Sequence, residues 1–409
     1  MQLKKLLISV TAIGMFATLA SVPASATDAK APSPRPSPLI PSELAAEPAA
    51  KPGQMSARLS AETCTTPAEG RQACLTTIPA TQSPTLSGSR GLRAGVNPPQ
   101  WCEDARDQIR GLREAVCWVS SLKYTTYRTV QGRRQVTGQA KMNVINYSYG
   151  DSGLPAWGYQ IEVSAYQGRG DAMKASVSGK ATKKGACKVT ESKFPAKKLA
   201  PLNSWKLGES FFDTTATRAG AIGRCATTWT LTFTNSGYPS AASTFTLNEF
   251  RCDNATGGRP EVGCVVPWYA SPMIYSKARA PQLASHITRA QRSGLPGATF
   301  DRPLTRTTTE SVRKKNRDLA CPPDEPRPQG KTCDEYPLAT SEQGMSAGGA
   351  RRTFPGCSVQ GVPSRTGPKG ASACYIAKDD QNYQGGKTTS FYRAERVLEG
   401  DPFRVLIGS

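Results

Sequence analysis

The chain has 409 residues, twelve cysteines, one histidine and a formal net charge of +21. The lone histidine stands far from any cysteine cluster and there is no CxxC pair, which argues against a structural zinc site. A charge excess of this size favours an anionic partner, such as nucleic acid, anionic lipid or an anionic wall polymer.

The first 26 residues have the pattern of a secretory signal peptide. Lys4 and Lys5 precede an apolar run, and Ala24-Ser25-Ala26 offers a small-residue cleavage site. The run is shorter than the roughly 20 residues that a membrane span needs, and no second hydrophobic segment follows, so we expect no stable membrane insertion. All twelve cysteines lie beyond the cleavage site, and their even number predicts disulfides in a secreted, extracellular protein.

Residues 27–95 are expected to form a leader that precedes the folded domains. Up to about residue 60 the segment is rich in proline, alanine and serine and has no periodic apolar positions. That composition predicts an extended or disordered chain without a core.

Residues 96–275 show the two-residue period of β-strands. Trp229, Leu231 and Phe233 alternate with threonines in TTWTLTFTN, and similar alternation occurs over 159–165 and 173–177. Several short strands with one apolar face predict an antiparallel, sandwich-like or barrel domain, with disulfides among its six cysteines from position 102 to 264. The ordinary role of such an accessory domain is binding or scaffolding.

Residues 276–320 are predicted to be a linker with a short helix, PQLASHITRAQRSGLPG, that contains His286. No acidic or nucleophilic side chain is near His286 in sequence, so we interpret it as a packing or surface residue rather than a catalytic one. Residues 321–409 are predicted to form a small α+β unit, with a helix that starts at 388–390 and runs to about 398, and a final strand at 403–407.

The last segment differs from the rest of the chain in its charge and its acidic motifs. It carries eleven Lys and Arg against ten Asp and Glu, so nearly all of the positive excess lies before residue 321. The stretch CDEYPLATSEQG brings Asp334, Glu335 and Glu342 close in sequence, and DDQNYQGG adds Asp380 and Asn382. Their carboxylate and amide oxygens suit a hard cation such as Mg²⁺, Mn²⁺ or Ca²⁺. The alternative is that these acidic side chains near turns are merely solvated.

Four separated elements, CDEYPLATSEQG, NYQGG, FYRAERVLEGDPF and the terminal FRVLI, resemble the NucA/NucB-type secreted deoxyribonuclease domain over roughly residues 315–409. The hallmark of that family is an Asp-Glu-aromatic-Pro motif followed by an Asn-x-x-Gly element and a helix. The resemblance implies a compact relative of the ββα-metal endonucleases that cuts DNA with one divalent cation, Mg²⁺ or Mn²⁺.

Phosphodiester hydrolysis needs a base for the attacking water and a counter-charge for the developing oxyanion. The last segment contains no histidine, so a carboxylate must serve as the base, with Asp334 as the first choice and Glu335 as the second. By its match to the family motif, Asn382 is the expected metal ligand, and Glu342 or Asp380 is a further ligand or an outer hydrogen-bond acceptor.

The chain departs from the small members of that family at two positions. They carry an arginine where this chain has Cys333 and another where it has Tyr383. The basic group that holds the scissile phosphate must therefore come from elsewhere in the segment. The candidates are Lys331, Lys378, Lys387 and Arg393.

We therefore expect a multidomain protein with a sandwich-like β-rich domain and a small α+β, ββα-metal-like nuclease domain. The predicted function is secreted, metal-dependent and sequence-nonspecific cleavage of DNA, with RNA as a side substrate. The alternative is a basic cell-envelope or DNA-binding protein with an inactive nuclease-like domain. We also expect Cys321 to pair with Cys333 and Cys357 with Cys374, and a fragment from about residue 310 to cut DNA if it folds alone.

Overall fold

The computed structural model describes residues 47–51, 62–83, 86, 96–104 and 106–409. The predicted signal peptide and a large part of the predicted leader lie outside these residues. Within the described part of the chain, no helix is both long and apolar enough to cross a membrane.

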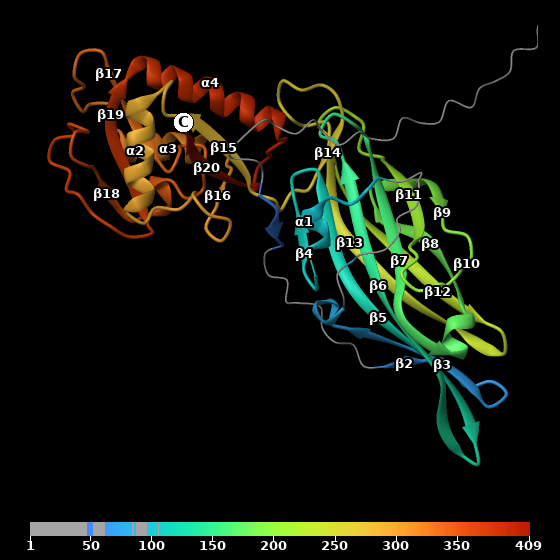
Figure 1. Ribbon diagram of the computed structural model, residues 1–409. Helices are drawn as coiled ribbons and strands as arrows, with labels where there is room; N and C mark the ends of the chain where they lie inside the picture. The colour runs from blue at the N-terminus through green and yellow to red at the C-terminus, as the bar shows by residue number, and fades with distance from the viewer. Residues whose placement is uncertain (1–46, 52–61, 84–85, 87–95, 105) are drawn as a thin grey trace, which may run out of the picture. The chain divides into compact units, whose positions relative to one another are not determined.

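Two antiparallel sheets form the β-rich domain (Figure 1). The larger sheet has the order β1-β4-β5-β6-β7-β11-β9, and β3 pairs with both β5 and β2. Its strands are β1 (Ala49–Ala50), β2 (Thr63–Cys64), β3 (Arg71–Ile78), β4 (Ile109–Gly111), β5 (Ala115–Val130), β6 (Arg133–Gly150), β7 (Ala156–Gly170), β9 (Cys187–Lys193) and β11 (Lys206–Thr214).

The smaller sheet has the order β10-β8-β12-β13-β14. Its strands are β8 (Ser176–Gly185), β10 (Lys197–Lys198), β12 (Ile222–Asn235), β13 (Tyr238–Asp253) and β14 (Gly263–Val265). A short helix, α1 (Gln100–Glu103), and 3₁₀ turns at Ala80–Gln82 and Asp171–Lys174 complete the domain.

The two sheets share one core built from the alternating apolar positions of their strands. Trp229, Leu231 and Phe233 on β12 are fully buried, whereas the threonines between them face outward. Trp229 packs edge to face on Tyr159 of β7, with the ring centroids 6.3 Å apart. Burial of these large side chains drives the packing, at roughly 25 cal/mol per Å² of apolar surface.

The outer face of the larger sheet is covered as well. Ile145 and Tyr147 on β6 pack in a separate buried cluster with Leu86 and Cys102, and Trp101 packs against this cluster. Strands β5 to β7 are therefore buried on both faces over much of their length, which a strictly alternating pattern would not predict.

Part of the predicted leader is folded, which corrects the boundary drawn at residue 95. β3 pairs antiparallel with β5 from Arg71↔Arg128 to Ile78↔Ser121, and the disulfide between Cys64 and Cys74 joins β2 to β3. The proline-rich composition ends before this stretch, whose RQACLTTI sequence has the apolar and β-branched residues of a strand.

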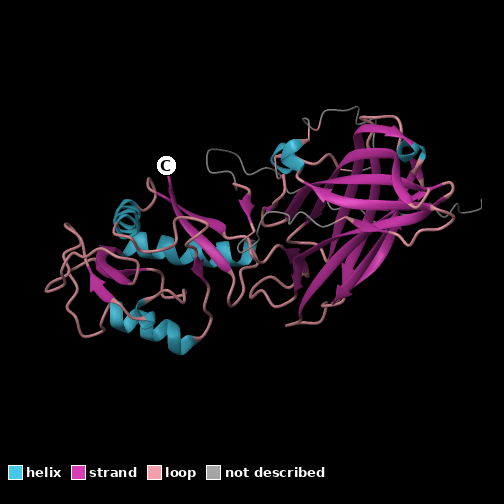
Figure 2. Cartoon of the chain, turned by 90° about the horizontal axis from the view of Figure 1, so that it is seen from below, coloured by secondary structure: helices cyan, strands magenta, loops and turns pink. Residues whose placement is uncertain are grey.

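Two three-stranded sheets and three helices make up the C-terminal unit (Figures 1 and 2). In one sheet, β20 (Pro402–Gly408) lies between β15 (Ser271–Ser276), its parallel partner, and β16 (Leu304–Thr305). In the other, β19 (Gly370–Ala377) lies between β17 (Lys331–Tyr336), which is antiparallel to it, and β18 (Ala350–Arg352). The helices are α2 (Pro281–Arg292), α3 (Glu310–Ala320) and α4 (Lys378–Ala394), with a 3₁₀ turn at Met345–Ala347. Because β19 runs directly into α4, β17, β19 and α4 form a ββα arrangement.

The C-terminal unit begins earlier in the chain than residue 321. β15 lies in the segment assigned to the β-rich domain, and α2, β16 and α3 lie in the segment assigned to the linker. The terminal strand β20 has β15 and β16 as hydrogen-bonding partners on its two edges, and no local pattern in the sequence indicates this long-range pairing.

Helix α4 begins at Lys378, about ten residues before the expected helix start. The stretch DDQNYQGG is therefore helical, although Gly385 and Gly386 are poor helix formers. Buried contacts made by Gln384, Phe391 and Tyr392 on one face of α4 compensate for this low propensity. The helix position decides which side chains of the motif share a face.

Six disulfides join all twelve cysteines. In the C-terminal unit the pairs are Cys321–Cys333 and Cys357–Cys374, as expected from the sequence. The other pairs are Cys64–Cys74, Cys102–Cys117, Cys187–Cys225 and Cys252–Cys264.

A buried ionic network joins the β-rich domain to the segment before β20. Arg251 on β13 donates to both carboxylate oxygens of Asp401, at 2.7 and 2.5 Å, and Arg113 donates to Asp401 at 3.1 Å. Arg396 donates to Asp253 at 3.2 Å. Because each charge is buried with a partner, removing one member would leave an uncompensated charge in the interior.

Candidate active site

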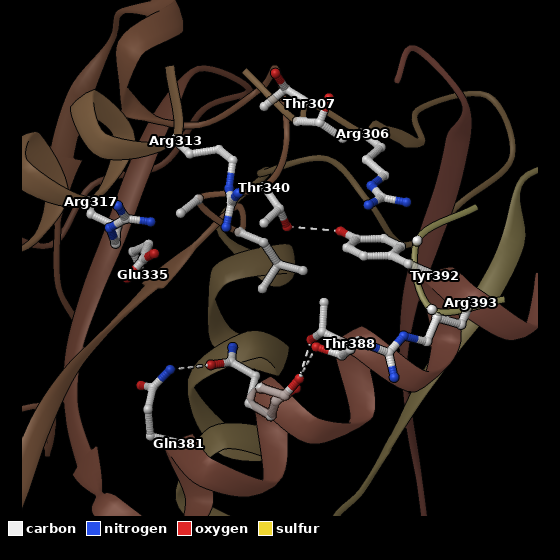
Figure 3. Close-up of a pocket in the computed structure, with 18 of the residues that line it drawn as sticks. Arg306, Thr307, Arg313, Arg317, Glu335, Thr340, Gln381, Thr388, Tyr392 and Arg393 are labelled. Carbon is white, nitrogen blue, oxygen red and sulfur yellow. Dashed lines mark hydrogen bonds between the residues drawn. The ribbon is translucent and has the colours of Figure 1, made fainter. Parts of the chain in front are cut away.

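A polar cleft of about 660 Å³ opens in the C-terminal unit (Figure 3). Residues of α3, of α4 and of the turn after β17 line it, and Thr256, Gly257 and Gly258 from the β13–β14 connection contribute to its edge. Four arginines, two glutamines and several threonines face the cleft, together with a single carboxylate, that of Glu335. The lining therefore suits an anionic ligand.

Three of the four arginines come from the segment between β16 and the end of α3. Arg313 and Arg317 are one helical turn apart on α3 and point into the cleft. Both reach Glu310, at 3.1 Å each. Arg306 lies over the ring of Tyr392, 4.2 Å from its centroid. Arg393, near the end of α4, is the fourth (Figure 3).

Glu335 lies on β17 with its side chain toward the cleft, beside Arg317 (Figure 3). Adjacent residues of a strand point to opposite faces, so Asp334 points the other way, into the core. The pKa of Glu335 is raised from 4.5 to about 7; desolvation is the largest cause and the negative charge of Asp334 the second, whereas Arg317 acts in the opposite direction. A carboxyl group with this pKa can take up and release a proton near neutral pH.

Asp334 is buried and contacts a histidine instead of the cleft. Its Oδ2 lies 2.6 Å from Nδ1 of His286 on α2, and Nε2 of His286 lies 2.8 Å from the hydroxyl of Ser372 on β19. Both His286 and Asp334 are about 1% exposed. His286 thus has an acidic partner, 48 positions away in the sequence, which the sequence interpretation did not anticipate.

Helix α4 presents amides and hydroxyls to the cleft. Gln381, Gln384 and Thr388 lie at helical spacing on one face, and all line the cavity. The Gln381 amide donates to the Gln384 side-chain oxygen at 2.6 Å. The Gln381 side-chain oxygen is buried and accepts no hydrogen bond from any residue that the structure describes.

The structure does not bring the three expected metal ligands together in the cleft. Asn382 is exposed, on a different face of α4 from Gln381. Glu342 is also exposed, and its backbone N–H donates to Thr305. Asp380 is buried and accepts hydrogen bonds from the backbone N–H groups of Gln282 and Leu283, at 2.8 and 3.0 Å, so it caps the start of α2.

Of the four expected phosphate-binding residues, Arg393 alone lines the cleft. Lys331 donates to the Gln282 side chain at 2.6 Å and lines a different cavity, next to His286. Lys378 and Lys387 are exposed on α4 and do not line the cleft.

The sequence interpretation missed the arginines of α3, Arg306, and the two glutamines. If DDQNYQGGKTT is taken as a helix, its periodicity places Gln381, Gln384 and Thr388 on one face, and this was the pattern in the sequence that could have identified them. The basic run RTTTESVRKKNRD, in the segment predicted to be a linker, supplies Arg306, Arg313 and Arg317.

The four arginines make the cleft positive as a whole, and few of its groups are oxygen donors that suit a hard divalent cation. The free, buried oxygen of Gln381 is a ligand of the preferred type, and Mg²⁺ commonly completes its shell with water and substrate phosphate oxygens. Among the described residues, the single group of three His, Cys, Asp or Glu ligand atoms close enough to share an ion is Glu62 with Cys64 and Cys74, whose sulfurs form a disulfide. A fully protein-built cage of such side chains is thus not found in this part of the chain.

The cleft next to this ββα arrangement is lined by arginines, whose guanidinium groups suit phosphate oxygens. Residues 289–406 match the family model described as Deoxyribonuclease NucA/NucB. The C-terminal part of the chain therefore carries a NucA/NucB-type domain, as its motifs predicted, and this family commonly uses divalent cations.

Comparison with other proteins adds little. No curated protein matches the chain. A solved structure of the GAE domain of GGA2p from Saccharomyces cerevisiae matches with a TM-score of 0.18 and 8% identity, over 30% of this chain and 94% of that chain. A similarity this weak carries no argument about the β-rich domain.

Proposed function

We propose that the protein is a secreted, metal-dependent, sequence-nonspecific endodeoxyribonuclease, with Glu335 as the general base. The observation that carries the proposal is the position of a single carboxylate, with a pKa of about 7, among four arginines in one cleft. DNA is the substrate suggested by the NucA/NucB match.

The arginines bind and orient the scissile phosphate. Arg313 and Arg317 project from adjacent turns of α3, and their guanidinium groups can donate paired hydrogen bonds to phosphate oxygens. They also stabilise the extra negative charge that develops on the phosphoryl oxygens as water attacks. They take the place of the arginines that small family members carry beside the Asp-Glu pair and after the Asn.

Ionised Glu335 accepts the proton of the attacking water. Its near-neutral pKa lets it be largely deprotonated at slightly alkaline pH while it remains a strong enough base. Asp334 acts through Glu335: its buried negative charge raises the Glu335 pKa, and its contact with His286 fixes its own position. This role replaces the direct base role first assigned to Asp334.

A bound Mg²⁺ or Mn²⁺ would supply positive charge to a phosphoryl oxygen and to the leaving oxygen. Of the protein groups in the cleft, Gln381 is the one we propose as its ligand, instead of Asn382. The exposed Glu342 and the helix-capping Asp380 have no role in this scheme.

Secretion is supported by the six disulfides, which fit an oxidising compartment. We prefer an active enzyme to an inactive DNA-binding protein because the cleft contains both Glu335, whose pKa is raised toward neutrality, and arginines. RNA can be a side substrate, since activating water requires no 2′-hydroxyl.

The test is incubation of the purified full chain with supercoiled plasmid and Mg²⁺ or Mn²⁺, with and without chelator. We expect nicked and then linear DNA in the presence of the cation and intact plasmid with chelator. Plasmid that stays intact in both cations would refute the proposed activity.

A further inference from the structure

The β-rich domain carries a concentration of exposed lysines along β8, β9 and β10. The segment from β8 to β10 contains seven lysines and a single acidic residue, Glu191. All seven are exposed; they are Lys180, Lys183, Lys184, Lys188, Lys193, Lys197 and Lys198.

These lysines share one edge because the three strands lie together. β8 pairs with β10 through Val177 and Lys197. The end of β9 also lies against β8, since the Gly179 N–H donates to the carbonyl of Phe194 at 3.0 Å and the Ala181 N–H donates to the Ser192 hydroxyl at 3.1 Å. The folded chain thus gathers the charge on one edge of the domain.

Little of this charge is neutralised within the described structure. Lys193 pairs with Glu191, and Lys188 lies 3.4 Å from Asp213. Lys183 and Lys184 form no ion pair with another described residue. Unpaired, exposed cations on one edge favour an anionic polymer with regularly spaced charges.

One end of this edge lies close to the cleft. At the end of β8, Lys184 is in register with Ala226, and the Ala186 N–H donates to the carbonyl of Arg224, which is exposed. Three residues before Arg224, the carbonyl of Ala221 accepts a hydrogen bond of 2.9 Å from the Asn254 N–H, in the connection that follows β13. Asn254 is followed closely by Thr256–Gly258, which line the cleft.

We propose that Lys183, Lys184 and Arg224, here called the basic edge, bind the phosphate backbone of duplex DNA outside the cleft. The inference rests on the proposed function for the choice of DNA, because the chain just before Arg224 is hydrogen-bonded to the connection that forms the edge of the cleft. A long duplex held by the cleft arginines can then reach these three side chains. The β-rich domain would supply sequence-independent affinity, and the cleft would supply the chemistry.

The test uses the full chain with Glu335→Gln, which keeps DNA uncut, and measures binding of a labelled 30-base-pair duplex by fluorescence anisotropy from 50 to 200 mM salt. The triple variant K183Q/K184Q/R224Q removes three charges from the basic edge. A matched control, R128Q/R133Q/R169Q, removes three exposed charges from the opposite ends of the strands. Thermal melts check that both triple variants are folded, and the single variant K184Q replaces the first triple if it is not.

We expect the plot of log affinity against log salt to become shallower by about 0.9 for each lost phosphate contact in the basic-edge variant, and to stay unchanged in the control. Equal losses in both triple variants, or none in the first, would overturn the proposal. So would a basic-edge variant that loses binding to inorganic polyphosphate but keeps DNA binding, since that result points to a wall polymer. Because cleavage is not measured here, an inactive wild type would refute the proposed function without affecting this comparison.

Discussion

Replacing Asp334 by Asn tests whether Asp334 is itself the general base or instead raises the pKa of the general base, Glu335. Asp334 is buried against His286 and raises the pKa of Glu335 through its charge. Glu335 is shifted from 4.5 to about 7, with desolvation as the larger cause. Removing the second cause should lower the Glu335 pKa toward its ordinary value.

The sign of the effect on activity follows from the role of Glu335. A general base must be ionised, so kcat/KM rises with pH through the Glu335 pKa, and lowering that pKa moves the rise to lower pH. Well below its pKa, each unit by which the Glu335 pKa falls increases the ionised fraction, and therefore the rate, up to about ten-fold. The assay is kcat/KM for a fluorogenic duplex from pH 5 to 9.

A second variant should shift the pH profile in the opposite direction, because it removes Arg317, which lowers the Glu335 pKa. Arg317→Met should move the pH profile upward, in addition to weakening substrate binding. If Asp334→Asn instead reduces kcat/KM by a factor on the order of 10² at every pH without shifting the profile, Asp334 is the base and the assignment to Glu335 is wrong.

Three further predictions concern stability, the cation and the extent of the folded unit. His286→Ala leaves a buried carboxylate without its partner and should cost roughly 2 to 4 kcal/mol in the free energy of unfolding, measured with urea, while kcat per folded molecule changes little. A loss of kcat without a loss of stability would show that this histidine acts in catalysis. Gln381→Leu should raise the Mn²⁺ concentration needed for half-maximal cleavage at least several-fold, whereas Asn382→Ala should not; the reverse order would restore the first assignment of the metal ligand. A fragment of residues 310–409 lacks β15, α2 and β16 and should be unfolded by circular dichroism, and a folded, active fragment would contradict the domain boundary found here.

The sequence predicted the elements whose signals are local. The alternation around Trp229 predicted a strand with one buried face, and the motif CDEYP predicted a nuclease-like domain that includes Glu335. The preferred pairing of Cys321 with Cys333 and of Cys357 with Cys374 agrees with the structure. Each of these inferences needed information from a short stretch of chain.

The parts that could not be predicted depend on contacts between distant segments. His286 looked isolated because Asp334 and Ser372 meet it only in the folded chain. The start of α4 was misplaced because Gly385 and Gly386 suggest a loop, and tertiary packing overrides that preference. Because the helix includes this stretch, Asn382 faces outward and Gln381 faces the cleft.

The measurement that tests the account most directly is single-turnover cleavage of a duplex by Glu335→Gln, with Glu342→Gln as the matched control. Both changes remove one carboxylate from the same acidic motif, but Glu335 lines the arginine-rich cleft and Glu342 is exposed outside it. We predict that Glu335→Gln lowers the rate by a factor on the order of 10² or more, while Glu342→Gln remains close to wild type. A Glu335→Gln protein that cuts as fast as wild type, with correct folding and the same cation, would contradict the proposed active site.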